Sequence, residues 1–334
     1  MQLITLRIER DSNRASTSLS ALDSPQTLLV LFGDSGLLDR PEAIHRVLDT
    51  CPQSHVIGCS TSGEIYGSEI TDETLVVAAL HFEGTALGIA QAEVRNPTDS
   101  YAAGSSIAEQ LRDPSLKAVL VLSDGLSVNG SHLVNGLNEA LLGEVIVTGG
   151  LAGDGSRFKR TWVIQDRTPR SGYVTAVGLY GDRVCVGHGS QGGWDKFGPE
   201  RLVTKSSGNV LYELDGRPAL QLYKQYLGER ATGLPATGLL FPLALRAKKA
   251  EEKSLVRTIL AVNESQQSMT FAGDIPEGSF AQLMRANFDR LIQGASEAAL
   301  RTVTGVGGSE SQQPTLCIAI SCVGRRLVLG ERTE

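Results

Sequence analysis

Apolar runs of strand length alternate along the chain with segments whose apolar positions recur every three to four residues. Leu28–Phe32 and Ala118–Leu122 are continuous apolar runs, which is typical of buried strands. Between them, 41–50 begins with Pro41 and predicts an amphipathic helix. Further strands are expected over 2–9, 55–57, 74–82, 86–94, 145–147, 161–165, 173–180 and 183–188, and further helices over 99–112 and 129–143. The alternation predicts an α/β to α+β fold, with sheets covered by helices.

A turn-rich stretch from Gly187 to Gly198 interrupts this pattern, and we place a domain boundary there. The chain is thus divided into domains over 1–196 and 197–334, each expected to be a mixed β-sheet covered by helices. We expect no short internal repeat. In the second domain we predict strands over 201–205, 209–213, 255–262 and 268–272, helices over 218–228 and 279–302, and a final strand at Thr315–Ser321.

Composition narrows the class of protein. The 334 residues suffice for two cores, and a net charge of -6 argues against broad binding to nucleic-acid phosphates. No stretch approaches the roughly 20 apolar residues of a membrane span. Arg7, Glu9 and Arg10 occupy the place where a signal peptide needs an apolar core. We therefore expect a cytoplasmic protein.

The five cysteines, at positions 51, 59, 185, 317 and 322, include no CxxC pair. Such a scattered, odd set favours free thiols in a reducing compartment, and we expect no zinc site.

Two glycine-rich loops each follow a predicted strand and are candidates for binding a ligand. Glycine lets backbone N–H groups approach a ligand closely, and hydroxyl groups can donate or accept hydrogen bonds. A small polar group such as a carboxylate would suit these loops, whereas the competing interpretation is a tight turn that only returns the chain. Neither loop has the spacing of a nucleotide-binding motif. The candidate residues are Gly58, Cys59, Ser60, Thr61, Ser62, Gly63 and Glu64 in the first loop, and Gly149, Gly150, Gly153 and Asp154 in the second.

Three of the reactive side chains have competing interpretations. Asp154 could bind a metal ion, but an aspartate between glycines is more often a turn residue. Cys59 could be a nucleophile at a strand end, but it would need a base, and His55 on the same strand is not aimed at it by strand alternation. Cys322 precedes two guanidinium groups that would favour its thiolate form, although packing is the commoner role.

An axial haem ligand needs a neutral imidazole that faces an apolar slot. Among the five histidines, His188 has the most suitable neighbours, because Trp194 and Phe197 are close in sequence and could line such a slot. A structural or surface role is the alternative for each histidine.

Four segments resemble the FIST family, in the family's order and over nearly the whole chain. Val56–Ile65 resembles the signature of the FIST N domain, and Gly149–Asp154 is similar to its second hallmark. Val203–Ala219 resembles the join into FIST C, and Ser321–Gly330 is similar to a FIST C hallmark. We add Arg325 and Arg326, from the last segment, to the candidate ligand-binding residues.

The resemblance implies a sensor of bacterial signal transduction rather than an enzyme. FIST proteins resemble ligand-sensing modules that work with histidine kinases or cyclic-di-GMP signalling proteins, and amino acids have been proposed as their ligands. Some stand-alone members are haem proteins that sense nitric oxide and restrain a partner histidine kinase. The resemblance thus offers haem b as a cofactor, with His188 as its candidate ligand, and one of these signalling proteins as a partner.

One feature departs from the family. The FIST C domain usually continues beyond the segment that ends here at Glu334, so we expect a chain truncated at its C-terminal end. An open sheet edge would then be free to pair with a second copy in a homo-oligomer.

Two other functions remain open. One is a thiol-dependent hydrolase or transferase that uses Cys59 or Cys322, and the other is an interaction scaffold without a ligand.

Overall fold

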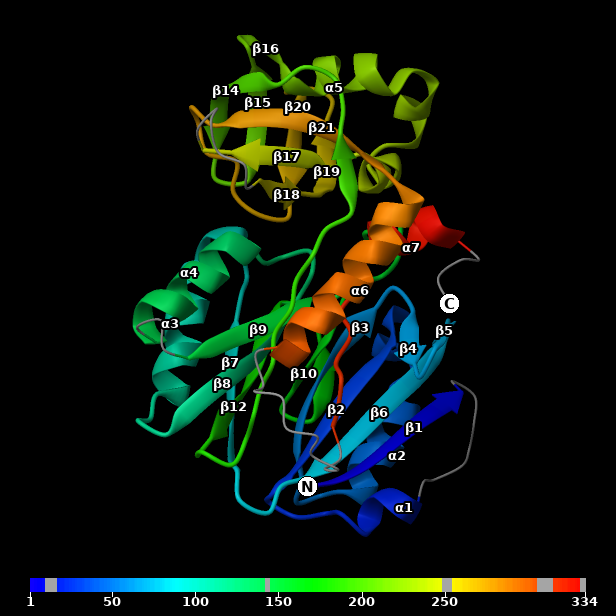
Figure 1. Ribbon diagram of the computed structural model, residues 1–334, viewed down its shortest axis with the longest axis vertical. Coiled ribbons are helices and arrows are strands. Elements are labelled where there is room, and N and C mark those ends of the chain that lie inside the picture. Colours follow the sequence, from blue (N-terminus) through cyan, green and yellow to red (C-terminus); the bar gives the residue numbers. More distant parts are fainter. Residues whose placement is uncertain (10–16, 142–144, 248–253, 305–314, 331–334) are drawn as a thin grey trace.

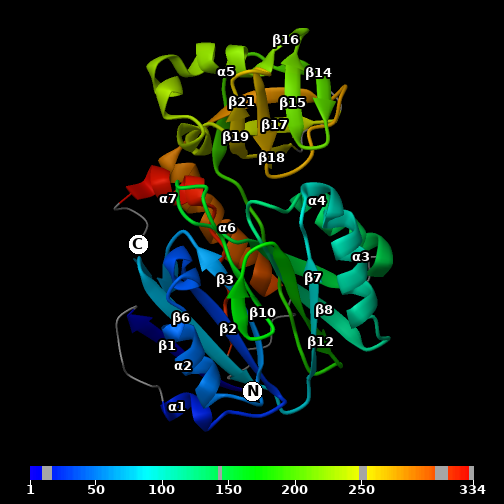
Figure 2. The same cartoon turned by 180° about the vertical axis from the view of Figure 1, so that it is seen from behind.

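The computed structural model describes residues 1–9, 17–141, 145–247, 254–304 and 315–330. The N-terminal half forms two sheets that face each other, with helices on both outer faces, and the C-terminal half forms a third sheet (Figures 1 and 2). The predicted mixed α/β class is confirmed.

The first sheet contains six strands, and the second contains four. In order across the first sheet they are β1 (Gln2–Glu9), β6 (Thr74–His81), β2 (Thr27–Asp34), β3 (His55–Thr61), β10 (Val163–Gln165) and β11 (Thr168–Arg170). Across the second they are β7 (Ala86–Glu93), β12 (Tyr173–Tyr180), β8 (Leu116–Ser123) and β9 (Ile146–Leu151). A two-stranded hairpin of β4 (Glu64–Tyr66) and β5 (Glu69–Thr71) lies between β3 and β6 in the chain.

The two sheets repeat one topology. The order β1-β6-β2-β3 corresponds strand by strand to β7-β12-β8-β9, and only the last pair of each set is parallel. The registers also correspond: Leu3, Leu80, Leu28 and His55 lie side by side in one sheet, as Leu87, Leu179, Ala118 and Ile146 do in the other. The chain therefore has a repeat of about half a domain, which is too long and too diverged to show as a short sequence period.

Each outer face is covered by its own helices. α1 (Thr17–Ser20) and α2 (Glu42–Thr50) lie on the first sheet, where α2 buries Ile44, Val47 and Leu48 as its apolar stripe predicts. α3 (Ser100–Leu111) and α4 (Gly130–Leu141) cover the second sheet. Short 3-10 turns at Ser35–Leu38 and Pro97–Asp99 lead into α2 and α3. The inner faces pack together around Ile57, Cys59, Leu122 and Val177.

The third sheet belongs to the C-terminal half. Its strands, in order, are β18 (Leu255–Arg257), β17 (Leu243–Arg246), β21 (Phe280–Ala286), β14 (Arg201–Ser207), β15 (Val210–Leu214), β20 (Ser268–Phe271) and β19 (Ile259–Asn263), with β13 (Trp194–Lys196) beside β21 and β16 (Arg217–Pro218) beside β15. α5 (Ala219–Leu227) and the 3-10 turns Gly228–Gly233 and Ala236–Leu240 pack on this sheet.

The last two helices return toward the N-terminal sandwich. α6 (Phe288–Thr304) runs diagonally from the third sheet across the first two, and α7 (Val323–Leu329) lies near its start (Figure 1). The glycine-rich stretch lets α6 approach closely: a Cβ on Gly294 would lie 2.0 Å from the carbonyl oxygen of Gly192, and one on Gly189 would lie 1.9 Å from that of Ala298. The segment in which we placed the domain boundary therefore also packs closely against this helix.

Several predicted elements differ from the structure. The helix predicted over 279–302 begins only at Phe288, because Ala281 and Leu283 alternate inward on the central strand β21. The predicted strand 183–188 has no regular structure, and 255–262 divides into β18 and β19. Thr315–Ser321 is not a strand, although Leu316 and Ile318 pack on the inter-sheet core.

Two further differences concern the candidate loops and the end of the chain. The strand near 145–147 is a half-exposed edge strand that continues to Leu151, through the predicted glycine loop, and β3 likewise continues past Gly58 to Thr61. Val323–Leu329, which the sequence patterns did not mark as a helix, forms α7.

Equivalent glycines in the two repeats yield a prediction about stability. A Cβ on Gly149, whose φ is +151°, would lie 1.8 Å from the carbonyl oxygen of Val121, and one on Gly58 would lie 2.6 Å from that of Leu31. We expect Gly149→Ala to lower the free energy of unfolding by about 2 kcal/mol or more, because backbone atoms must move apart. Urea unfolding measures this loss.

Gly192→Ala is the matched control, because a Cβ added at this position would have no heavy atom within 4 Å and its φ is not positive. Equal urea midpoints for the two variants would contradict the close packing of β9 on β8.

Candidate functional site

The two candidate loops meet where β3 and β9 end. The Gly153 amide donates to the Ser60 carbonyl oxygen over 2.9 Å, and the Gly155 amide donates to Ser62 Oγ over 2.9 Å. One loop belongs to each repeat, so this junction joins the ends of equivalent strands. We call Ser60–Glu64 together with Gly153–Gly155 the loop junction.

The first loop is held by its own side chains. Ser60 is fully buried, and its hydroxyl oxygen accepts from the Trp162 amide over 3.1 Å. Thr61 donates to Glu64 Oε1 over 2.6 Å, and the Thr74 amide and hydroxyl donate to Glu64 Oε2 over 3.2 and 2.8 Å. Burial raises the pKa of Glu64, and these hydrogen bonds oppose part of that rise. Glu64 thus fixes the shape of the turn into β4.

Asp154 plays a similar part in the second loop. It is buried, and its carboxylate accepts from the amides of Phe158, Lys159 and Arg160 over 3.2, 2.7 and 3.1 Å. The interpretation of Asp154 as a turn residue agrees with these contacts. In the part of the chain that the structure describes, no three His, Cys, Asp or Glu side chains gather as a metal site would require.

α7 brings Arg326 to the loop junction. Its guanidinium donates to the Ser62 carbonyl oxygen and, over 2.7 Å, to Asp72 Oδ2. It lies against the bare backbone of Gly63, where a Cβ would stand 1.8 Å from Nη1 and where φ is +134°. Gly63 is therefore the residue that makes room for Arg326. Three segments singled out in the sequence, far apart in the chain, converge here.

The remaining candidates lie around this junction in different roles. Gly58 and Gly149 lie within β3 and β9 beneath the carbonyls of the neighbouring strands, and Gly150 faces Ile320. Arg325, next to Arg326, donates instead to the Gln191 carbonyl oxygen over 3.2 Å. Cys322 caps α7, since its sulfur accepts from the Arg325 amide over 3.4 Å.

Cys59 lies in the inter-sheet core rather than in an open loop. Burial raises its pKa to about 12, so it is a thiol at neutral pH. This environment opposes the nucleophile interpretation of Cys59, because the thiolate is the reactive form.

The aromatic side chains near His188 do not converge on it. Trp194 packs against Gly324 of α7, and Phe197 packs edge-to-face with Phe241 at a ring-centre distance of 6.3 Å. His188 itself is exposed in a segment without regular structure. The residues present do not form the apolar slot that motivated His188 as a haem ligand.

Sequence reasoning missed two groups of polar residues. Asp124 is buried at the end of β8 and accepts from Leu126, Ser127, Thr161 and Gly172. The signal for it was an aspartate two residues after each long apolar run, since Asp34, the last residue of β2, follows its run in the same way and accepts from Gly36.

The second missed group joins the two halves of the molecule. Asp274, before β21, accepts from Asn129 Nδ2 over 2.6 Å and lies 3.0 Å from His132 Nε2, at the start of α4. Arg257 donates to the Asp274 carbonyl oxygen and to Ser131 Oγ. We call this the α4 contact. No local pattern could have revealed it, because the residues that it joins across the two halves are more than 120 positions apart.

Family models match both halves of the chain. The FIST N domain matches residues 27–217, and the FIST C domain matches residues 219–334. The chain belongs to the FIST family. FIST domains are generally sensory domains that bind small ligands in signal transduction, which suggests a sensor rather than a catalyst. The family models divide the chain at 217–219, whereas the third sheet already includes β13 at Trp194.

Other comparisons add little. A search of curated proteins finds no match. Among solved structures, a crystal structure of a chorismatase is similar at 11% identity and a TM-score of 0.28, over 85% of this chain and 98% of that one. A likeness at that level carries no argument about this chain. None of the helices in the described ranges is both long and apolar enough to cross a membrane.

The burial of the thiols predicts their reactivity. Cys185, Cys317 and Cys322 are exposed, whereas Cys51 and Cys59 are buried. We expect an aromatic disulfide reagent at pH 8 to modify the three exposed thiols quickly in native protein, with the two buried thiols reacting only after unfolding.

Cys59→Ser is the control, since it should leave the fast thiol count unchanged. A fast reaction that disappears in this variant would restore the nucleophile interpretation of Cys59.

Proposed function

We propose that this FIST protein is a sensor for a small polar metabolite that carries a carboxylate, amino acids included, and that the metabolite binds at Arg326 over the loop junction. The observation that carries the proposal is the position of Arg326. It is a C-terminal side chain that lies on the N-terminal loops, so a ligand there would contact both halves of the molecule.

The present partner of Arg326 is exchangeable. The Asp72 side chain is 69% exposed, and ion pairs of this kind contribute about 0–1 kcal/mol because water screens them. A carboxylate ligand can replace Asp72 at little cost and accept two parallel hydrogen bonds from the guanidinium. The Ser62 hydroxyl, which accepts from Gly155, retains a proton that it can donate to such a ligand.

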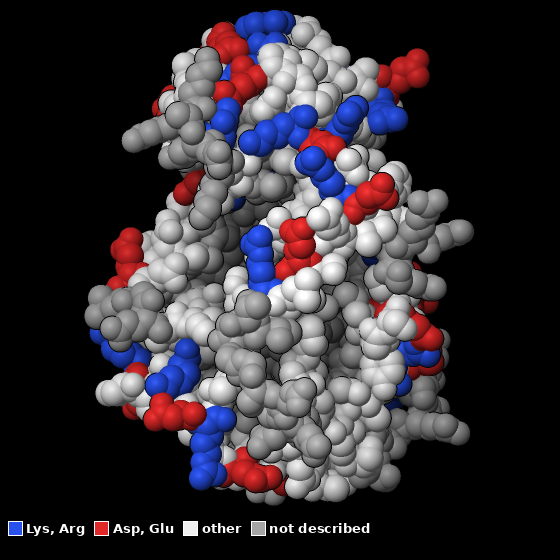
Figure 3. Space-filling view, in the orientation of Figure 1, with Lys and Arg blue, Asp and Glu red and all other residues white. Residues whose placement is uncertain are grey.

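Binding would be transmitted through α7. Arg325, the residue before Arg326, donates to Gln191 in the glycine-rich stretch that packs against α6. A shift of Arg326 would therefore change how α6 and α7 pack on the sandwich. Figure 3 shows that the surface is hollowed between the third sheet and the sandwich on the face drawn there. We propose that the output passes to a signalling partner, either a histidine kinase or a cyclic-di-GMP enzyme, as the family resemblance implies.

Haem with nitric oxide remains a prediction of the family resemblance alone. The side chains around His188 do not support it, and we derive no step from it. An absorbance titration with haemin tests it separately: a sharp Soret band lost in His188→Ala would favour haem at this residue.

Thermal unfolding with a panel of amino acids and small dicarboxylates tests the proposal. A ligand at a hundredfold excess over its Kd adds about 2.7 kcal/mol to the stability, which amounts to several degrees in Tm. We expect one chemical group of the panel to raise the Tm of the wild type and of Arg325→Ala, but not of Arg326→Ala.

Arg325→Ala is the matched control, because it removes a neighbouring guanidinium that does not touch the loop junction. A shift that survives Arg326→Ala would place the ligand elsewhere, and the absence of any shift across the panel would contradict the ligand class.

A further inference from the structure

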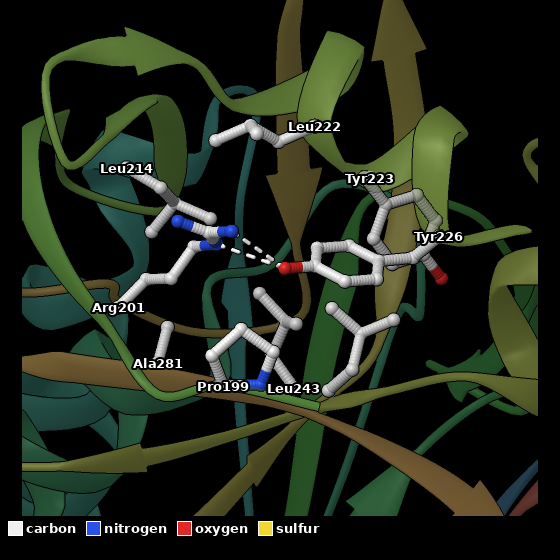
Figure 4. Close-up of a pocket in the computed structure, with 9 residues that line it drawn as sticks. Pro199, Arg201, Leu214, Leu222, Tyr223, Tyr226, Leu243 and Ala281 are labelled. Carbon is white, nitrogen blue, oxygen red and sulfur yellow. Dashed lines mark hydrogen bonds between the residues drawn. The ribbon is translucent and has the colours of Figure 1, made fainter. Parts of the chain in front are cut away.

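The C-terminal half contains a small cavity with an arginine at its edge (Figure 4). Its wall is apolar apart from Arg201 and two tyrosines, and its free volume of about 10 Å³ holds at most one water molecule. Leu214, one of its walls, belongs to the Val203–Ala219 segment that resembles the entry into FIST C, which the proposed function leaves unused. The wall is formed by Pro199, Arg201, Leu214, Leu222, Tyr223, Tyr226, Leu243, Ala281 and Leu283.

Tyr226 closes this cavity in an unusual way. Both Nε and Nη2 of Arg201 donate to the Tyr226 hydroxyl oxygen, over 3.1 and 2.6 Å, so one neutral atom takes up a whole edge of the guanidinium. That edge matches the two oxygens of a carboxylate, each of which would accept one of the two hydrogen bonds. Arg201 already forms one ion pair, in which its Nη1 donates to the Asp215 carboxylate over 2.9 Å.

The position of Tyr226 allows it to leave. It is the second-last residue of α5, it is only half-buried, and a Cβ added to Gly198 would lie 3.7 Å from its ring. Tyr223, one turn earlier, is buried and donates to the Phe241 carbonyl oxygen, so it remains as a fixed wall. Rotation of Tyr226 outward would open a slot the size of its own ring, lined by Leu222 and Leu243.

We propose that this slot is a second ligand site, which binds a small carboxylate with an apolar body about the size of a phenyl ring. The ring of Tyr226 and its hydroxyl occupy the positions of the ligand's body and of its carboxylate. The carboxylate pairs with Nε and Nη2 of Arg201, and the apolar body packs against Leu222 and Leu243. This site is separate from Arg326 and does not depend on the proposed function.

Calorimetric titration with benzoate tests the site. Tyr226→Ala removes the competing side chain, so we expect it to bind benzoate at least tenfold more tightly than the wild type does. Adding Arg201→Met to Tyr226→Ala should abolish this binding. Adding Arg217→Met should leave it unchanged, because Arg217 is an exposed arginine that contacts Gln225 and is not part of the cavity wall. Benzyl alcohol, which has the same ring and no charge, should bind at least tenfold more weakly.

A measurement on the wild type guards against variants that do not fold. Methyl NMR signals of Leu222 and Leu243 should shift as benzoate is added in the millimolar range, and the same shifts should occur in Arg326→Ala. The proposal is overturned if Tyr226→Ala, with a native circular dichroism spectrum, binds benzoate no better than the wild type does. It is also overturned if binding survives Arg201→Met, or if the methyl signals that shift belong to the sandwich.

Discussion

The hydrogen bond from the Gly153 amide to the Ser60 carbonyl joins the ends of two equivalent strands, and much of the molecule is arranged around it. It requires β3 and β9 to end at the same place, which the matched registers of the two repeats ensure. It requires both loops to be narrow, which the glycines allow. The carboxylates of Glu64 and Asp154 accept hydrogen bonds from their own loops, so each loop keeps its shape when they meet. The loop junction is thereby a rigid surface on which another part of the chain can rest.

Polar and apolar contacts among the described residues connect the sandwich to the C-terminal half, and Leu316 and Ile318 pack on its inter-sheet core. Arg326 reaches the loop junction from α7, and the α4 contact joins Asp274 to the start of α4 on the other side of the sandwich. α6 crosses between the halves and packs closely against the glycine-rich stretch before β13 (Figure 1). A protein with separate cores joined by such contacts suits a sensor, because a ligand that alters the contacts can change how the halves are arranged.

The sequence predicted what depends on local periodicity. Strands such as 2–9 and 173–180 and the amphipathic α2 lie where expected, because their side chains alternate or repeat against one core. The two glycine loops and the segment that contains Arg326 were identified as candidates, and the structure brings them together. That they meet could not be read from any of them alone, since the Arg326 hydrogen bonds join residues about 260 positions apart. Phe280–Ala286 was mistaken for a helix because its central position in the sheet, rather than its own pattern, makes it a strand. Cys59 and His188 were candidates because of their residue types. The burial of Cys59 opposes a nucleophilic role, and Trp194 and Phe197 pack against residues other than His188.

Arg326 holds the loop junction to the C-terminal half of the molecule through its hydrogen bonds to Ser62 and Asp72. Amide hydrogen exchange at Gly153 and Gly155 measures how often the junction opens. Each of these amides donates a hydrogen bond across the junction, to the Ser60 carbonyl oxygen or to Ser62 Oγ. We expect both amides to exchange at least about tenfold faster in Arg326→Ala than in Arg325→Ala, a difference that corresponds to about 1.4 kcal/mol. Equal exchange rates in the two variants would mean that the junction is stable without Arg326, which would overturn this role of the arginine.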